Sequence, residues 1–158
     1  PEALHTGELV QTCIASIRQR FDEAGAEVGI EGALPGIVSD RTALEQIFSN
    51  LLDNAAKYLV NGRPGRIAVR GKTKGGYAIF EIEDNGRGVA ESDQERIFEL
   101  FRRAGAQDRP GEGIGLAHTR ALARRLGGDV KVSSDGVSGT TFRVIIARDL
   151  GALLRSDI

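Results

Sequence analysis

Apolar residues recur three and four positions apart in three stretches of this chain, which predicts three long helices. The helices are expected at residues 8–24, 41–59 and 115–126. Thr6 is expected to cap the first helix, and Ser39 and Asp40 are good N-cap residues for the second. Gly127-Gly128 is expected to end the third helix.

Alternating apolar and polar residues predict strands around these helices. The strands are expected at residues 27–30, 66–72, 77–84, 130–133 and 140–147. Gly75-Gly76 and Asp135-Gly136 separate two pairs of strands and predict hairpins. The stretch 86–113 is irregular apart from a short helix expected at about 94–101. The pattern predicts an α+β fold, a two-layer sandwich with helices on one face of a mixed, mostly antiparallel sheet.

The length suits one domain with a core of its own. The chain has 158 residues, of which 41% are hydrophobic and 27% are charged, as is ordinary for a soluble fold. We expect a single domain over residues 1–158, with its core at about 6–148 and a C-terminal tail at 149–158. The isolated domain is expected to be monomeric.

Charge and cysteine content narrow the classes of partner. The net charge of -1 gives no electrostatic reason to expect nucleic acid or an anionic membrane as a partner. Cys13 is the single cysteine, which fits a reducing compartment and excludes a cysteine-based zinc cluster. No run approaches the roughly 18 apolar residues of a membrane span, and no signal segment opens the chain. Because the chain lacks methionine and begins at Pro1, we expect a cytoplasmic fragment of a longer protein, whose membrane anchoring the sequence leaves open.

Three polar residues share one face of the second predicted helix. Asn50, Asn54 and Lys57 fall about 120° around the cylinder from the centre of the apolar stripe, at roughly 100° per residue. The stripe consists of Leu44, Ile47, Phe48, Leu51, Leu52 and Ala55. The three polar side chains are therefore expected to face a rim or a cleft and not the middle of the core. Two carboxamides and an ammonium in one row suit a cation and a polyphosphate.

Two glycine-containing segments could complete such a site. Asp84-Asn85-Gly86-Arg87-Gly88 follows a predicted strand, where an aspartate can accept a hydrogen bond from an exocyclic amine; an ordinary turn is an equal alternative. Gly111-Glu112-Gly113-Ile114-Gly115-Leu116 opens a predicted helix, where backbone N–H groups can cradle an anion; a glycine-rich hinge is the alternative. The second segment has neither a P-loop ending nor dinucleotide-fold spacing.

A fourth signal lies in Ile97-Phe98-Glu99-Leu100-Phe101-Arg102-Arg103. Two phenylalanines three positions apart can anchor a mobile segment to a core, and the two arginines are placed to meet a phosphate. A short amphipathic helix with solvated arginines is the alternative. The stretch 102–113 is long and contains glycines, which is typical of a lid.

In their order and spacing, these segments resemble the motifs of the catalytic ATP-binding domain of bacterial sensor histidine kinases, which has the Bergerat-type nucleotide fold. Residues 50–58 are similar to the N box, 84–88 to the first glycine box, 97–101 to the F box, 111–116 to the second glycine box and 139–142 to the closing Gly-Thr strand motif. The resemblance covers about residues 6–148.

The resemblance implies a Mg-ATP site beneath a mobile ATP lid. Asn54 would coordinate Mg²⁺ through its carboxamide oxygen, Asn50 would support the metal and phosphate site, and Lys57 would reach the phosphates as a point charge. Tyr58 would pack on the adenine, and Asp84 would accept a hydrogen bond from its amino group. The other implied contacts are Gly86, Gly88 and Thr140 around the adenine, Arg102, Arg103 and Arg109 as lid candidates for phosphate, and Gly111, Gly113, Gly115 and Leu116 in the second glycine box.

Position 50 discriminates within this superfamily. The relatives that hydrolyse ATP carry a water-activating glutamate there, whereas Asn50 cannot act as a general base at neutral pH. The resemblance therefore implies transfer of the γ-phosphate to a histidine on an upstream dimerisation domain, and onward signalling to a response regulator. His5 and His118 are not expected to be that acceptor. The alternative is a nucleotide-binding pseudokinase, and an ATPase of the topoisomerase or chaperone type is disfavoured by Asn50.

Overall fold

The structure of the chain is a computed structural model, which describes residues 1–94, 97–98 and 112–156. Its central feature is a five-stranded sheet with the order β2-β4-β5-β7-β6. The strands are β2 (Ala26–Ile30), β4 (Gly65–Lys74), β5 (Tyr77–Asp84), β6 (Asp129–Ser134) and β7 (Thr140–Ala147). The β2–β4 pair is parallel and the other three pairs are antiparallel. The expected strands and both hairpins are therefore confirmed.

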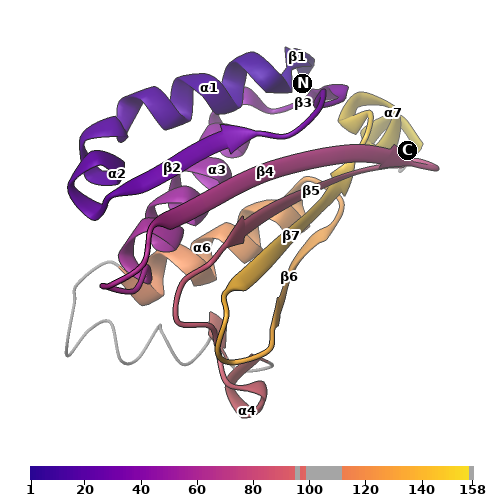
Figure 1. Cartoon of the computed structure of the whole chain (residues 1–158). Coiled ribbons are helices and arrows are strands. Elements are labelled where there is room, and N and C mark those ends of the chain that lie inside the picture. The colour runs from indigo at the N-terminus through magenta and orange to yellow at the C-terminus, as the bar shows by residue number, and fades with distance from the viewer. Residues whose placement is uncertain (95–96, 99–111, 157–158) are drawn as a thin grey trace.

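The long helices cover one face of this sheet, as Figure 1 shows. They are α1 (Thr6–Ser16), α2 (Arg18–Ala24), α3 (Arg41–Lys57) and α6 (Glu112–Arg125). Every residue of the α3 stripe from Leu44 to Leu52 is fully buried, and Phe48 meets Phe80 of β5 edge to face with centroids 5.2 Å apart. The predicted α+β architecture with helices on one face of a mostly antiparallel sheet is confirmed.

The first predicted helix is interrupted, which is a correction to the sequence analysis. Residues 8–24 were expected to form one helix, but α1 ends at Ser16, Ile17 leaves the helical region, and α2 begins at Arg18. The Ser16 hydroxyl donates to the Cys13 carbonyl oxygen at 2.8 Å, and the Ile17 N–H turns to the Ile14 carbonyl oxygen at 3.3 Å. Serine competes with the helical hydrogen bonds in this way, and the apolar spacing does not register the break.

Helix caps follow the prediction at one helix and not at the other. The Asp40 carboxylate accepts a hydrogen bond from the Ala43 N–H at 3.0 Å and caps α3, whereas Ser39 is the last residue of a strand. Thr6 is wrong as a cap: it lies inside α1, is 1% exposed, and donates its hydroxyl to the Pro35 carbonyl oxygen at 2.5 Å. A buried hydroxyl takes the nearest acceptor, and here that acceptor comes from another part of the chain.

A second, two-stranded sheet lies near both ends of the chain, and the sequence did not predict it. It pairs β1 (Glu2–His5) antiparallel with β3 (Gly36–Ser39). The Val38 N–H donates to the Arg148 carbonyl oxygen at 3.0 Å, so this small sheet is tied to the end of β7. Residues Leu150–Ser156, in the stretch expected to be a tail, form helix α7, and Leu150 is buried.

The short helix expected at about 94–101 is described only in part. Helix α4 spans Glu91–Gln94, and Ile97 and Phe98 are helical and buried. The lid expected over 102–113 lies outside the described residues except for its last two positions, which belong to α6.

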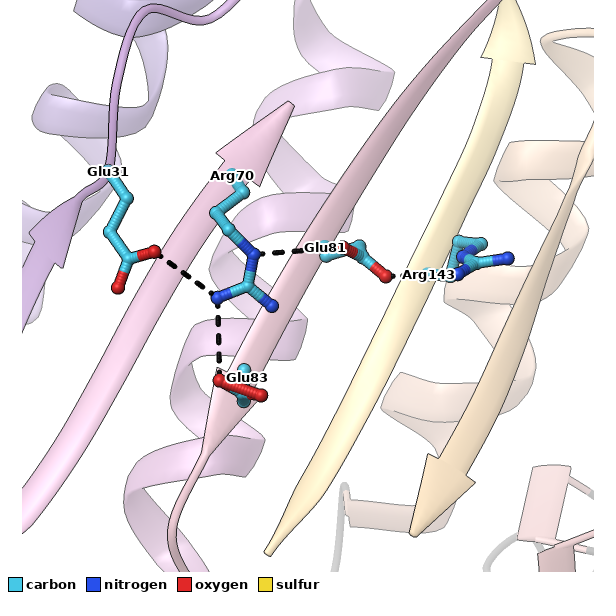
Figure 2. A network of polar contacts seen from close by, with 5 residues as sticks. All are labelled: Glu31, Arg70, Glu81, Glu83 and Arg143. Carbon is cyan, nitrogen blue, oxygen red and sulfur yellow. Dashed lines mark hydrogen bonds and ion pairs between the residues drawn. The ribbon is translucent and has the colours of Figure 1, made fainter. Parts of the chain in front are cut away.

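The face of the sheet turned away from the helices is polar. Arg70 of β4 lies between three carboxylates, with nitrogen–oxygen distances of 3.4 Å to Glu31, 3.6 Å to Glu81 and 3.4 Å to Glu83, and Arg143 of β7 meets Glu81 at 3.1 Å (Figure 2). Pairs as exposed as these contribute roughly 0–1 kcal/mol each, so the network keeps this face soluble more than it stabilises the fold.

Small residues hollow out the same face. Gly29, Ala68 and Thr141 lie in a depression of about 810 Å³ that crosses the sheet. Asn50, Asn54 and Lys57 do not line this hollow. In the part of the chain that the structure describes, no helix is long and apolar enough to cross a membrane.

Candidate functional site

The last two turns of α3 carry the polar row that the sequence singled out. Asn54 is 7% exposed, while Asn50 and Lys57 are half-buried. None of the hydrogen bonds between described residues uses the Asn54 side chain, although a buried carboxamide ordinarily finds partners. Asn54 is thus more enclosed than a rim position, and the chemistry of its side chain suits an oxygen ligand to a cation.

Lys57 is engaged by an acidic residue of its own helix. Its Nζ lies 3.3 Å from Asp53 Oδ2, one helical turn earlier, and the other oxygen of Asp53 lies 2.6 Å from Nη1 of Arg20 in α2. The carboxylate therefore sits between two cations. Any phosphate that approached Lys57 would compete with Asp53 for the ammonium group.

Asn50 is linked to the helix that follows the second glycine segment. Its Nδ2 donates to Thr119 Oγ1 at 3.2 Å, and the Thr119 hydroxyl donates to the Gly115 carbonyl oxygen at 2.6 Å. Thr119 is fully buried, so this contact lies inside the interface between α3 and α6. The first polar residue of the row is therefore held in a defined orientation.

Asp84 ends β5 as a buried carboxylate. It is 6% exposed, and its Oδ1 accepts a hydrogen bond from the Gly86 N–H at 2.8 Å. Burial raises the pKa of this carboxyl from 3.8 to about 6, against the opposing effect of the backbone N–H groups of Gly86 and Thr140. A strongly desolvated acceptor at the end of a strand is the arrangement expected of a ligand-binding group and not of an ordinary surface turn.

The segment after Asp84 is fastened to the end of α3. The Arg87 N–H donates to the Tyr58 carbonyl oxygen at 3.0 Å, and Arg63 donates to the carbonyl oxygens of Asn85 and Gly86 at 2.6 and 2.8 Å. A Cβ on Gly86 would lie 2.3 Å from the Tyr58 carbonyl oxygen, so only glycine allows this approach. The polar row of α3 and the buried carboxylate of β5 are thereby brought to one end of the molecule.

The other side of the Asp84 segment rests on the turn between β6 and β7. Ser134 Oγ accepts from the Val89 N–H at 2.9 Å and donates to the Gly139 carbonyl oxygen at 2.5 Å. Gly139 has a φ of +138°, and a Cβ there would lie 2.0 Å from the Asp84 carbonyl oxygen. Thr140 pairs with Asp84 across β5 and β7 and is 6% exposed. The predicted residues Asp84, Gly88 and Thr140 are therefore brought together around this turn.

The second glycine segment is more helical than expected. Helix α6 begins at Glu112 and not at Gly115, so Gly113 lies within its first turn. A Cβ on Gly115 would meet no atom of the described residues within 4 Å. Leu116 is 1% exposed and its side chain belongs to the core. His118 is exposed on the same helix.

Phe98 anchors the predicted F box to the core. Its ring lies edge to face against Phe142 of β7, with centroids 6.4 Å apart, and the Arg120 guanidinium of α6 lies 4.7 Å from its centroid. The expected anchoring role of the first phenylalanine is confirmed. Phe101 lies outside the described residues, as do the predicted phosphate contacts Arg102, Arg103, Arg109 and Gly111.

Sequence reasoning missed several polar residues that shape the site. Neither Arg63 nor Thr119 belongs to a motif that the sequence singled out. Asp53 lay inside the quoted motif, and its i,i+4 spacing to Lys57 was a signal that could have revealed their ion pair. No local spacing connects Thr119 to Asn50, since 69 positions separate them.

Cys13 is a buried thiol. Its Sγ lies 3.7 Å from the Glu45 carbonyl oxygen, and burial raises the pKa of the thiol. A thiol that is both enclosed and protonated at neutral pH is not a reactive centre.

Comparisons with known proteins agree on the kind of domain. The family model described as "Histidine kinase-, DNA gyrase B-, and HSP90-like ATPase" matches residues 39–150. The phytochrome-like protein Cph1 of Synechocystis is 32% identical over 136 residues, which are 85% of this chain and 18% of Cph1. This chain therefore spans less than a fifth of that relative.

Solved structures show the same architecture. Full-length ShkA in complex with AMPPNP is 28% identical with a TM-score of 0.77, and the match covers 90% of this chain and 30% of ShkA. The mycobacterial sensor histidine kinase MprB is 29% identical with a TM-score of 0.75, and the match covers 92% of this chain and 97% of the MprB chain.

Proposed function

Because this chain belongs to the histidine kinase-, DNA gyrase B-, and HSP90-like ATPase family, we propose that it is the ATP-binding catalytic domain of a sensor histidine kinase. It would position Mg-ATP for transfer of the γ-phosphate to a histidine on a separate dimerisation domain. In the longer protein, which we place in or facing the cytoplasm, a response regulator would receive the phosphate next. The similarity to nearly all of the solved MprB chain supports the kinase branch of the family.

The joint between α3 and the Asp84 segment carries this proposal. The hydrogen bond from the Arg87 N–H to the Tyr58 carbonyl oxygen brings the segment of the buried Asp84 carboxylate next to the end of the helix that bears Asn54 and Lys57. A nucleotide needs both features at once, since its base and its phosphates lie at opposite ends of one small molecule. Neither feature alone distinguishes a binding site from an ordinary turn or a solvated helix face.

At the adenine end, we assign the hydrogen bond with the base to Asp84 and the shape of the pocket to the neighbouring residues. Asp84 accepts a hydrogen bond from the exocyclic amino group, and Tyr58 packs against the ring. Gly86, Gly88 and Thr140 form the rest of this pocket, where a Cβ at position 86 would lie 2.3 Å from the Tyr58 carbonyl oxygen and Thr140 is buried. A guanine would present an oxygen to Asp84 in place of the amine, so the pocket selects adenine.

At the phosphate end, Asn54 supplies the carboxamide oxygen to Mg²⁺. Among the described residues, no group of three or more His, Cys, Asp or Glu side chains is arranged to hold a metal ion. Mg²⁺ commonly takes one or two protein oxygens and completes its shell with water and phosphate, which fits a single buried carboxamide. Bound Mg²⁺ would neutralise charge on the phosphates. The phosphates are held and oriented by Asn50, Lys57 and the second glycine segment. Arg102, Arg103 and Arg109 are the candidates for a further phosphate contact from the lid.

Transfer, and not hydrolysis, follows from the residue at position 50. The nucleophile is an imidazole nitrogen of the acceptor: its bond to the γ-phosphorus forms as the bond from that phosphorus to the ADP oxygen breaks. A carboxamide cannot take a proton from water at neutral pH, so Asn50 positions the reactants and does not activate water. The chain's own residues therefore contribute binding, orientation and charge screening.

Calorimetric titration of the domain with ATP, with and without Mg²⁺, tests the binding site. We expect Mg²⁺ to strengthen ATP binding in the wild type, and this gain to disappear in Asn54→Ala while binding in EDTA stays the same. Asn61→Ala, in the exposed turn after α3, is the matched control and is expected to behave like the wild type. An Asn54→Ala variant that keeps the full gain from Mg²⁺ would show that the metal ligand is misassigned.

Labelled ATP tests the reaction in the longer protein that contains this domain. Acid-labile phosphohistidine is expected, and Asn50→Ala should reduce it. Binding of Mg-ATP without any phosphohistidine would instead favour a pseudokinase. Steady ATP turnover by the domain alone, abolished by Asn50→Ala, would contradict transfer and point to an ATPase.

A further inference from the structure

The hydroxyl group of Thr119 is bonded on both sides inside the interface between α3 and α6. The side chain is 0% exposed. Its Oγ1 donates to the carbonyl oxygen of Gly115 at 2.6 Å and accepts from Nδ2 of Asn50 at 3.2 Å. A threonine hydroxyl has one proton, so once this proton is given to Gly115 only lone pairs remain for other partners.

The single proton of the Thr119 hydroxyl determines the orientation of the Asn50 carboxamide. The nitrogen and the oxygen of a carboxamide have nearly the same shape, but only the NH₂ group can donate to an oxygen whose proton is already used. Rotating the amide by half a turn would set two acceptors, Asn50 Oδ1 and Thr119 Oγ1, against each other. The nitrogen of Asn50 is therefore held toward α6, and its oxygen is directed away from that helix.

We propose that Thr119 is a positioning residue that presents the oxygen of Asn50, and not its NH₂ group, to Mg-nucleotide. This inference rests on the proposed function, in which Asn50 supports the metal and phosphate site. A carboxamide oxygen can bind Mg²⁺ or a water molecule of its shell, whereas an NH₂ group turned the same way would repel the cation. Thr119 acts only through Asn50 and touches no atom of the nucleotide.

The same arrangement connects the orientation of Asn50 to the second glycine segment. The acceptor of the Thr119 proton is the carbonyl of Gly115, four residues earlier in α6.

The orientation is tested by NMR of the Asn50 side-chain NH₂ group, assigned by its loss in Asn50→Asp. In the wild type we expect one of its two protons to be shifted and slow to exchange with water because it is hydrogen-bonded to Thr119. Thr119→Val removes the hydroxyl and should abolish both properties, and Thr119→Ser should restore them. Thr12→Val is the matched control, because Thr12 makes the same hydroxyl bond to a carbonyl four residues earlier, on the exposed face of α1.

The consequence is tested by titrating the same variants with Mg-AMPPNP. Thr119→Val should weaken binding roughly fivefold, as expected for one hydrogen bond, with Thr119→Ser and Thr12→Val within about twofold of the wild type. An unchanged Asn50 signal in Thr119→Val would overturn the inference, and so would binding that stays weak in a stably folded Thr119→Ser. A wild type that shows the expected Asn50 signal but binds no nucleotide would instead contradict the proposed function.

Discussion

The guanidinium of Arg87 lies over the ring of Tyr58, with its Cζ 4.1 Å from the ring centroid, while its backbone N–H donates to the Tyr58 carbonyl oxygen at 3.0 Å. Arg87 therefore contacts Tyr58 through both its side chain and its backbone. One face of the aromatic ring is already covered by a cation. A base that packs against Tyr58 must therefore use the ring's other face or its edge.

Arg87→Ala should weaken adenine nucleotide binding about two- to fivefold, because an exposed cation–π pair of about 0.5–1 kcal/mol no longer orients Tyr58. The backbone hydrogen bond remains, so the free energy of unfolding should change by less than about 1 kcal/mol. Displacement of a fluorescent ATP analogue measures the affinity. Arg143→Ala, which removes an arginine paired with Glu81 on the far face of the sheet, should leave the affinity unchanged. Equal effects of the two substitutions would point to a general loss of positive charge.

Asp84→Asn should stabilise the nucleotide-free domain at neutral pH. The folded-state pKa of Asp84 is about 6 against an ordinary value of 3.8, so above pH 6 the fold holds a buried charge at a cost of up to about 3 kcal/mol. As the pH falls from 6 toward 4, the folded domain takes up a proton that the unfolded chain does not, and this cost disappears. Melting temperatures across pH 4.5–8 should therefore show the full advantage of the variant over the wild type above about pH 6, and an advantage that shrinks as the pH falls from 6 toward 4.

The same substitution should reduce adenine recognition. The carboxamide oxygen introduced by Asp84→Asn can still accept a hydrogen bond from the Gly86 N–H, so the turn is expected to survive. It presents a weaker acceptor to an exocyclic amine, and the preference for ATP over GTP should shrink. Competition titrations with the two nucleotides measure that preference. A wild type that binds ATP and GTP equally would contradict the adenine pocket itself.

Gly86→Ala should disrupt the joint between α3 and the Asp84 segment. Its Cβ would lie 2.3 Å from the Tyr58 carbonyl oxygen and 2.9 Å from Asp84 Oδ1, and neither backbone nor buried carboxylate can move freely. We expect a loss of roughly 2–4 kcal/mol in the free energy of unfolding by urea, together with weak nucleotide binding. Gly76→Ala, where a Cβ would meet nothing within 4 Å, is the control and should be near neutral. A stable, binding-competent Gly86→Ala variant would show that the joint is not needed.

Asp53→Asn should strengthen ATP binding. The substitution removes the carboxylate that lies 3.3 Å from the Lys57 ammonium and 2.6 Å from Arg20, leaving positive charge beside the expected phosphates. We expect an increase of about two- to fivefold at low salt that fades as ionic strength rises, with no gain for adenosine. Glu81→Gln removes a similarly paired carboxylate from the far face of the sheet and should have no such effect. A weaker affinity would instead mean that Asp53 holds Lys57 in its working position.

Secondary structure was largely predictable because its signals are local. The alternation in residues 66–84 and the stripe of α3 each lie within one short window, and the structure confirms both elements. The helix break at Ile17 was not predictable in this way, because the apolar spacing continues through it. The pairing of β1 with β3 was also missed: each strand has four residues, too few to show a period.

By itself, the sequence determined the residue types and spacings of a nucleotide site: the row on α3, the Asp84 segment and the glycines, all within continuous motifs. The tertiary structure decided how these groups are held. The amide of Asn50 is oriented by a hydroxyl 69 positions away, and the carboxylate of Asp84 is desolvated by the strands that close around it. Hydrogen-bond direction and burial depend on neighbours that meet only when the chain folds, so no local pattern encodes them.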